Sequence, residues 1–232
     1  MSLPFFYIAS CDPRASELEL DEGSSKHVVQ VLRMEEGEEL SLTDGKGNLL
    51  TAVITGAHKR KCRVAINSSS TLPPPEKKVA IAISPIKSAS RFEWFLEKAT
   101  EIGISEIIPL LCDRTERQVV REDRLQGILV SAMLQSRQVW LPVLRPPTPF
   151  SRLVGAGDYD RRLIAWLGES VRPAVPGPDR RPTLVLIGPE GDFSRDETAG
   201  AMRSGFVPVS LGPNRLRTET AGVVAATLLC IG

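Results

Sequence analysis

The feature that most constrains the fold of this chain is a run of three prolines within residues 71–76. Proline fixes its own backbone torsion and lacks an amide donor, so this run cannot lie inside a helix or a central strand. It forms a stiff, extended spacer instead. Because the residue patterns on its two sides differ, we predict two domains, residues 1–72 and residues 73–232.

Before the spacer, four segments alternate in polarity or are rich in β-branched residues, which is typical of strands: residues 4–8, 39–43, 48–55 and 61–67. The sequence Asp-Gly-Lys-Gly at 44–47 predicts a hairpin turn between two of them. One helix is predicted at 26–33, with Ser24 or Ser25 as its N-cap. Together these patterns predict a small β-barrel with one helix.

After the spacer, strand-like and helix-like segments alternate. Apolar runs predict strands at 79–84, 106–111, 162–167, 183–187 and 207–211, and helical spacing predicts helices at 91–102, 123–135 and 219–230. Gly103 is expected to end the first helix, and Trp94 and Phe95 to lie in its core face. This alternation predicts an α/β domain with a largely parallel sheet and helices on both faces.

Two loops in the second domain are rich in glycine and proline. Residues 186–194 read Leu-Ile-Gly-Pro-Glu-Gly-Asp-Phe-Ser, and residues 211–221 read Leu-Gly-Pro-Asn-Arg-Leu-Arg-Thr-Glu-Thr-Ala. Each loop follows a predicted strand and leads into a helix-like segment, so both lie at the edge where α/β sheets bind ligands. Either loop alone would read as an ordinary turn, but together they predict a ligand pocket.

The charge balance gives no RNA-binding signature of its own, because 29 Lys and Arg residues face 28 Asp and Glu residues. Local basic clusters at 59–63 and at 114–124 either contact RNA or form solvated faces. The four cysteines are scattered and the two histidines stand apart, so neither a disulfide framework nor a metal site is expected. Without a signal-like N-terminus or a membrane-length apolar run, we expect a cytoplasmic protein and no membrane partner.

Residues 27–34, residues 97–103 and the two loops, in this order, resemble the RsmE family of 16S rRNA (uracil-N3) methyltransferases in the SPOUT superfamily. The resemblance implies a PUA-like β-barrel for RNA and a catalytic domain with a C-terminal trefoil knot. It also implies S-adenosylmethionine as methyl donor, a homodimer, and methylation of N3 of one uridine in the small ribosomal subunit. One departure lies at 134–137, where many relatives have Glu-Gln-Ser-Gly and this chain has Leu-Gln-Ser-Arg.

On this basis the two loops are expected to bind the donor, largely through main-chain groups. The residues concerned are Leu186, Ile187, Gly188, Pro189, Glu190, Gly191, Leu211, Gly212, Asn214, Leu216, Thr218 and Ala221. Thr218 is also a candidate cap of the final helix. The expected RNA contacts are Arg33, Lys59, Arg60, Arg114 and Arg117.

Arg217 and Glu219 are the candidate catalytic residues. N3 of uridine carries a proton that must leave, and the Arg217 cation would stabilise the uracil anion that develops. Glu219 would accept a proton or hold Arg217. The residues alone do not fix the methylated atom, so a ribose 2′-hydroxyl target stays open, as does a non-catalytic ribosome-assembly factor. A nucleotide-phosphate enzyme is disfavoured, because the chain has neither a P-loop nor a Gly-x-Gly-x-x-Gly segment.

Overall fold

The computed structural model describes residues 3–9, 15–116, 119–156, 159–166, 168, 173–178 and 180–231. The chain forms two compact units. The N-terminal unit contains Met1–Pro74 together with Met133–Leu141, and the C-terminal unit contains Pro75–Ala132 and Pro142–Gly232. The first boundary falls inside the proline run. Among the described residues, no helix combines the length and the apolar character needed to cross a bilayer.

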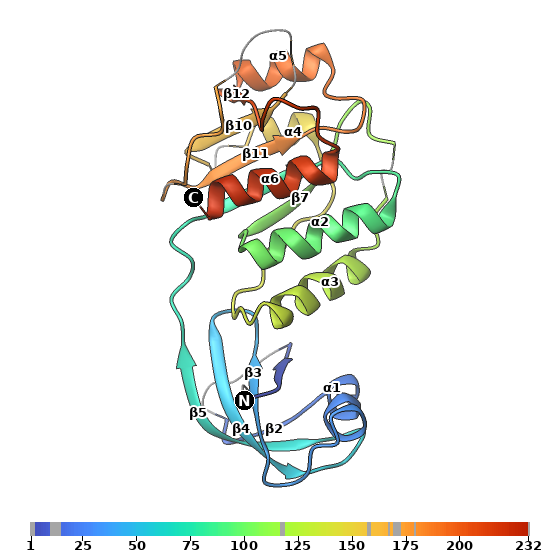
Figure 1. The fold of residues 1–232 in the computed structure, drawn as a ribbon, viewed down its shortest axis with the longest axis vertical. Coiled ribbons are helices and arrows are strands. Elements are labelled where there is room, and N and C mark those ends of the chain that lie inside the picture. Colours follow the sequence, from blue (N-terminus) through green and yellow to red (C-terminus); the bar gives the residue numbers. More distant parts are fainter. Residues whose placement is uncertain are drawn as a thin grey trace. The chain divides into compact units, whose positions relative to one another are not determined.

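The N-terminal unit is built on a five-stranded sheet in the order β1-β3-β4-β5-β2 (Figure 1). The strands are β1 (Phe5–Tyr7), β2 (Glu17–Glu19), β3 (Glu39–Thr43), β4 (Asn48–Gly56) and β5 (Arg63–Thr71). Leu40 and Leu42 of β3 are fully buried, because alternate residues of a strand point to the same face. The predicted hairpin between β3 and β4 is confirmed, and the Asp44 carboxylate accepts from the Lys46 amide at 2.8 Å.

The helix of this unit begins earlier than predicted. Helix α1 (Glu22–Lys26) runs directly into a π-helical turn, η1 (His27–Val31). The prediction of Ser24 or Ser25 as the cap was wrong, because Asp21 Oδ1 accepts from the Ser24 amide at 3.0 Å. Burial alone would raise the pKa of Asp21, but the hydrogen bonds from Ser24, from the Gly23 amide and from its own amide together hold the pKa below its ordinary value. The Ser25 hydroxyl instead donates to the Leu20 carbonyl inside the unit.

The segment Met133–Leu141 completes the N-terminal unit at the β3–β4 turn. The Gly47 amide donates to the Val139 carbonyl at 2.8 Å, and the Leu141 amide donates to the Gly45 carbonyl at 2.8 Å. Gly47 has φ 93°, and a Cβ added there would lie 2.4 Å from Trp140 Cζ2. The indole ring therefore occupies the space that any other residue at position 47 would need.

The C-terminal unit is built on a seven-stranded sheet in which every strand pair is parallel. Its order is β12-β10-β11-β6-β7-β8, with β9 also pairing with β7. The strands are β6 (Val79–Ile83), β7 (Glu106–Leu111), β8 (Val143–Leu144), β9 (Thr148–Pro149), β10 (Arg161–Ala165), β11 (Thr183–Ile187) and β12 (Val207–Val209). The predicted α/β architecture with a parallel sheet is confirmed.

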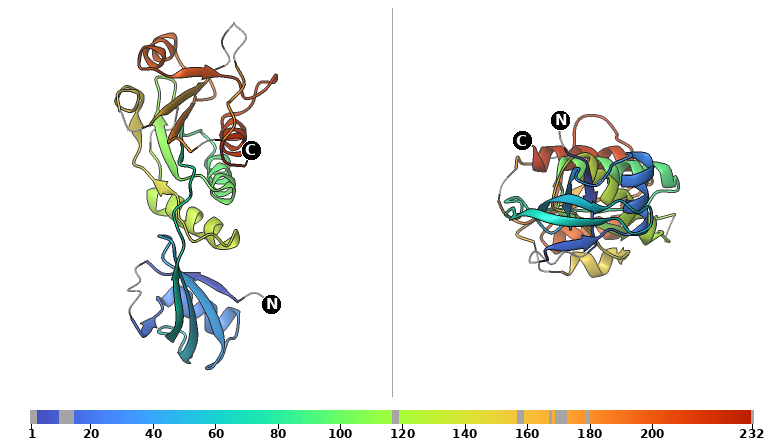
Figure 2. Two further views of the ribbon diagram at one scale, coloured as in Figure 1. Left: turned by 90° about the vertical axis from the view of Figure 1, so that its left-hand side faces the viewer. Right: turned by 90° about the horizontal axis from the view of Figure 1, so that it is seen from below.

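Helices cover both faces of this sheet (Figures 1 and 2). Helices α2 (Ala89–Ile102) and α6 (Thr218–Cys230) pack against each other, and α6 contacts β6 and β11. On the other face, Ala80 and Ala82 of β6 share a core with residues of α4 (Phe150–Val154) and α5 (Arg195–Arg203). Helix α3 (Glu122–Gln135) follows β7 in the chain.

The contact between α2 and α6 is close. Phe95 is fully buried as predicted, but Trp94 is 43% exposed, so the expectation that it lies in the core was wrong. A Cβ added to Gly222 of α6 would lie 2.6 Å from Phe95 Cε2 and 2.9 Å from Ile83 Cδ1. Glycine at 222 therefore allows α6 to approach both α2 and the sheet. Gly103 ends α2 in a left-handed conformation with φ 96°, as predicted.

Candidate functional site

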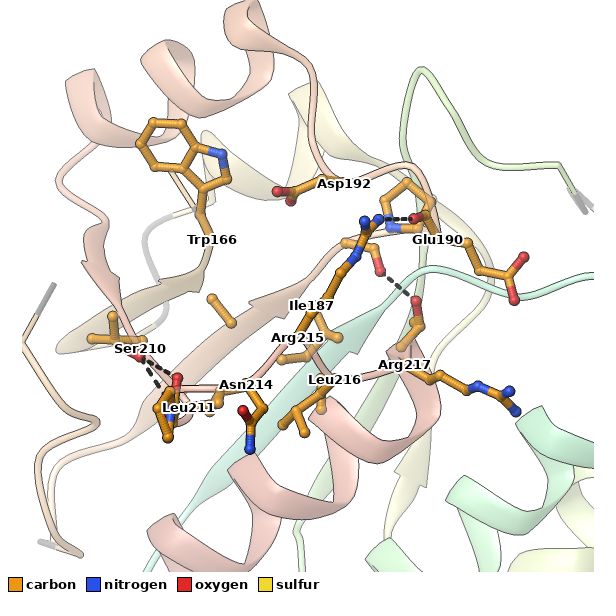
Figure 3. A pocket seen from close by; sticks show the side chains of 18 residues that line it. Trp166, Ile187, Glu190, Asp192, Ser210, Leu211, Asn214, Arg215, Leu216 and Arg217 are labelled. Atoms are coloured by element: carbon orange, nitrogen blue, oxygen red, sulfur yellow. Dashed lines mark hydrogen bonds between the residues drawn. The ribbon is translucent and has the colours of Figure 1, made fainter. Parts of the chain in front are cut away.

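A pocket of about 700 Å³ lies at the carboxyl ends of β10, β11 and β12 (Figure 3). Three separate stretches of chain, one after each of these strands, form its wall, and the start of α6 closes it. The lining residues are Ala165, Trp166, Ile187, Gly188, Pro189, Glu190, Asp192, Val209, Ser210, Leu211, Gly212, Pro213, Asn214, Arg215, Leu216, Arg217, Thr218 and Ala221. The two loops singled out in the sequence thus face one cavity.

Of the predicted donor-binding residues, all but Leu186 and Gly191 line this pocket. Leu186 is fully buried and belongs to the core beneath the sheet, because it points to the opposite face from its neighbour Ile187. The Gly191 carbonyl accepts a hydrogen bond from Nη1 of Arg114, a residue of the segment after β7, at 2.6 Å. Arg114, a predicted RNA contact, therefore braces the first loop.

A hydrogen bond ties the two loops together. The Thr218 hydroxyl donates to the Gly188 carbonyl at 3.1 Å, and Thr218 is 5% exposed. Thr218 therefore does not cap α6, whose N-cap residue is Arg217 and has no side-chain capping bond. The hydroxyl instead fixes the end of β11 to the beginning of α6.

Glycine is required in the second loop by its backbone conformation. Gly212 has φ 138°, a conformation that residues with a Cβ rarely adopt. The Ser210 hydroxyl accepts from the Gly212 amide at 3.2 Å and is within 3.0 Å of the Gly212 carbonyl. An added Cβ would meet no atom of the described residues within 4 Å, so the bare backbone faces open pocket space.

Two arginines of the second loop line the pocket. Arg215 Nη2 donates to the Glu190 carbonyl at 3.3 Å, which links the second loop to the first (Figure 3). Arg217 is exposed, and no carboxylate of the described residues lies within ion-pair distance of it. Its charge is therefore available to a bound group.

Glu219 does not line the pocket, and the structure gives it another partner than Arg217. Its side chain is 6% exposed, and Oε1 lies 3.8 Å from Nε of Arg91 in the first turn of α2. Oε2 is buried and has no hydrogen-bond partner among the described residues. The hypothesis that Glu219 holds Arg217 is thus replaced by an ion pair with Arg91, a residue that the sequence reasoning missed.

Trp166 and Asp192 are pocket residues that the sequence reasoning also missed. Trp166 directly follows β10, so it stands at the same sheet edge as the two loops, and that position was the available signal. Asp192 has φ 61°, a left-handed conformation that only a few residue types adopt readily. Figure 3 shows both side chains at one end of the pocket.

The predicted RNA contacts fall on both units. Arg33, Lys59 and Arg60 belong to the N-terminal unit and are exposed, and Arg60 Nε lies 3.8 Å from Glu22. Arg114 belongs to the C-terminal unit, and Arg117 lies outside the described residues. In the described part of the chain, no group of three or more His, Cys, Asp or Glu side chains is arranged to hold a metal ion.

Comparisons with known proteins agree with this geometry. A family model described as an RNA methyltransferase domain matches residues 73–230, and one described as an RNA methyltransferase PUA domain matches residues 20–67. Ribosomal RNA small subunit methyltransferase E of Synechocystis sp. is 30% identical over 216 residues, covering 86% of this chain and 68% of that protein.

Two solved structures share the fold over almost their whole length. The crystal structure of a probable rRNA-methyltransferase from Porphyromonas gingivalis is 39% identical, with a TM-score of 0.87 and coverage of 97% of this chain and 96% of that one. Ribosomal RNA small subunit methyltransferase E from Neisseria gonorrhoeae, bound to S-adenosyl methionine, is 26% identical, with a TM-score of 0.82 and coverage of 97% and 95%.

Proposed function

This chain belongs to the RNA methyltransferase family that includes ribosomal RNA small subunit methyltransferase E, and we propose that it transfers a methyl group from S-adenosylmethionine to N3 of one uridine in 16S rRNA. The observation that carries the proposal is the pocket formed by the two Gly-Pro loops. The Neisseria relative, which shares the fold along nearly the whole chain, was solved with S-adenosyl methionine bound.

The pocket fits the donor in size and in chemistry. Its volume of about 700 Å³ lies within the range of roughly 300–1,000 Å³ that is usual for sites of drug-sized ligands. Apolar side chains such as Leu211 and Leu216 suit an adenine ring, and the open backbone at Gly212 offers main-chain groups. The bound donor supplies a methyl group on a sulfonium, and the electrons of the broken C–S bond stay on sulfur.

We assign to Arg217 the role of stabilising the uracil ring that accepts the methyl group. Uracil N3 loses its proton to the solvent or a base and becomes nucleophilic, so negative charge develops on the ring. A cation held beside the ring lowers the free energy of that charge. Arg217 lines the pocket, is exposed and has no carboxylate partner among the described residues, so its charge is not already neutralised.

We further propose the assembly and location that the family resemblance implies. The chain would form a homodimer, contain a trefoil knot in the C-terminal unit and act in the cytoplasm on the small ribosomal subunit. Arg33, Lys59, Arg60, Arg114 and Arg117 would contact rRNA phosphates, so the affinity should fall steeply as the salt concentration rises. Light scattering at activity-assay concentrations tests the dimer, and a fully active monomer would refute it.

The experiment begins with calorimetric titration of the protein with S-adenosylmethionine and with its demethylated product. Small subunits lacking the modification are then incubated with protein and donor, and the rRNA is digested to nucleosides for mass spectrometry. N3-methyluridine is the expected product. A 2′-O-methyl nucleoside would overturn the assigned atom, and donor binding without transfer to any RNA would overturn the enzymatic function.

The Arg217→Ala variant tests the assigned residue. Turnover should fall by roughly 10²-fold or more, which is the usual effect of removing a donor to a developing anion. The dissociation constant of the donor should stay near that of the wild type. Arg152→Ala is a matched control, because Arg152 is an exposed arginine of α4 that does not line the pocket. Wild-type turnover of Arg217→Ala would remove this residue from the mechanism.

A further inference from the structure

Arg91 connects three elements at the carboxyl edge of the C-terminal sheet. It lies in the first turn of α2, where a positive side chain is opposed by the positive end of the helix dipole. Its Nη1 is 3.8 Å from Glu190 Oε1 in the first loop, and its Nε is 3.8 Å from Glu219 Oε1 in α6. The two carboxylates therefore offset the unfavourable interaction of the Arg91 cation with the helix dipole.

Glu219 depends on Arg91 more than Glu190 does. The Glu219 side chain is 6% exposed, whereas that of Glu190 is 50% exposed. A buried carboxylate is costly unless a cation or hydrogen-bond donors compensate it. Among the described residues, Glu219 Oε2 has no hydrogen-bond partner, and Arg91 is the cation at ion-pair distance from Oε1. Arg91 is thus the counter-ion of a nearly buried acid.

The position of Glu219 links this ion pair to the pocket. Glu219 is in the first turn of α6, two residues after Arg217 and one after Thr218, whose hydroxyl is bonded to Gly188. Both Glu190 and Arg217 line the pocket, and Figure 3 shows their side chains extending toward the same side of it. If Arg91 were absent, Glu190 in the pocket wall and Glu219, two residues after Arg217 in the chain, would lose the counter-ion that they share.

We propose that Arg91 is a positioning residue for methyl transfer, which neutralises Glu219 and Glu190 so that Arg217 stays unpaired and aimed at the acceptor base. This inference rests on the proposed function, since it concerns the same reaction. Arg91 acts through the two carboxylates and on the placement of the first turn of α6. The ion pairs of Arg91 are made to Glu190 and Glu219 and do not include Gly212 or its hydrogen-bond partner Ser210, on the donor side of the pocket.

The test compares Arg91→Ala, Arg91→Lys and Arg91→Ala/Glu219→Gln with the wild type. Arg91→Ala should lower kcat by roughly 10- to 100-fold, the range expected when a group acting at the reaction centre is misplaced. The donor dissociation constant should change less than about threefold, since the interaction lost belongs to the transition state. Arg91→Lys keeps the charge and should recover part of kcat.

The double variant distinguishes positioning from a merely structural role. Glu219→Gln removes the uncompensated carboxylate that competes for Arg217, so it should raise kcat of the Arg91→Ala chain by about tenfold. Arg152→Ala serves again as the control and should match the wild type. Unchanged kcat in Arg91→Ala, or no recovery in the double variant, would overturn the proposal.

Thermal unfolding of the same variants and of Glu219→Gln alone separates this proposal from the proposed function. The melting-temperature losses of Arg91→Ala and Glu219→Gln should be non-additive, because the two side chains form one ion pair. Additive losses would overturn the pairing whether or not the chain is active. A wild-type chain that transfers no methyl group, with non-additive losses, would refute the proposed function while retaining the Arg91–Glu219 pair. If Arg91→Ala does not fold, Arg91→Lys takes its place. A lowered kcat that adding Glu219→Gln raises again supports the proposal, and a wild-type kcat, or no rise on adding Glu219→Gln, overturns it.

Discussion

Replacing Gly222 with alanine adds one methyl group where α6 touches α2 and the sheet. The new Cβ would lie 2.6 and 2.7 Å from two atoms of the Phe95 ring and 2.9 Å from Ile83 Cδ1. Phe95 and Ile83 are both fully buried, so neither side chain has free space into which it can retreat. The helix itself must therefore shift away from its neighbours.

Two opposing effects set the size of the change. Alanine in a helix interior is favoured over glycine by about 0.5–1 kcal/mol. Overpacking a filled core costs about 1–3 kcal/mol. Because contacts this short with rigid groups belong in the upper part of that range, the net loss in the free energy of unfolding should be about 1–2 kcal/mol. For a chain of this size the melting temperature should fall by about 2–8 °C.

Gly127→Ala is the matched control. Gly127 lies in the exposed part of α3, and an added Cβ would meet no atom of the described residues within 4 Å, apart from its own helix backbone and chain neighbours. The same substitution should therefore stabilise the protein by about 0.5–1 kcal/mol. Differential scanning calorimetry should show a lower melting temperature for Gly222→Ala and a higher one for Gly127→Ala. A Gly222→Ala protein as stable as Gly127→Ala would refute the packing argument. Methyl transfer by Gly222→Ala should also fall, because displacing α6 separates Glu219 from Arg91.

Three further predictions concern single residues. Gly212→Val should abolish donor binding in calorimetry, because φ 138° strains a residue with a Cβ by about 1–3 kcal/mol and the side chain enters the pocket; an unchanged dissociation constant would contradict the assigned pocket. Burial raises the pKa of the Cys230 thiol to about 11 from its ordinary 9.0, despite the nearby Lys77. Alkylation of native Cys230 at pH 8, followed by mass spectrometry, should thus be far slower than in urea. Since the unfolded thiol ionises first, this group's contribution to stability is complete below pH 9 and is lost as the pH rises toward 11. Asp21→Ala should cost about 1 kcal/mol in urea denaturation through loss of the α1 cap, and no loss would argue against that cap.

Burial on both faces explains why much of the C-terminal sheet could be predicted from the sequence. β6, β7 and β11 consist almost wholly of buried residues, so each appears as a continuous apolar run. Helix α2 could be predicted from its apolar face and from the glycine that ends it. By contrast, β8 and β9 have two residues each, too few to form a pattern, and β2 reads Glu-Leu-Glu. The start of α1 was missed because serines and an aspartate compete for the cap, and geometry decides among them.

The candidate site was likewise predicted only in part from the sequence. The two loops were recognisable because glycine and proline mark backbone conformations that the sequence itself specifies. Trp166 needed the alignment of β10 with β11 and β12, which comes from strand pairing. Arg91 needed the packing of α2 against α6, a contact between residues 128 positions apart that no local pattern records.

During synthesis, the N-terminal unit can be completed only after part of the C-terminal unit has been made, because it includes Met133–Leu141. Its sheet ends at Thr71, yet the Gly45 and Gly47 backbone groups bond to Leu141 and Val139, which leave the ribosome only after α3. Chains emerge at about 5–20 residues per second, so the Gly45 carbonyl and the Gly47 amide stay without these hydrogen-bond partners for several seconds. During that interval the turn at 44–47 faces water, and a nascent chain arrested before Met133 would carry the whole sheet with this edge still open.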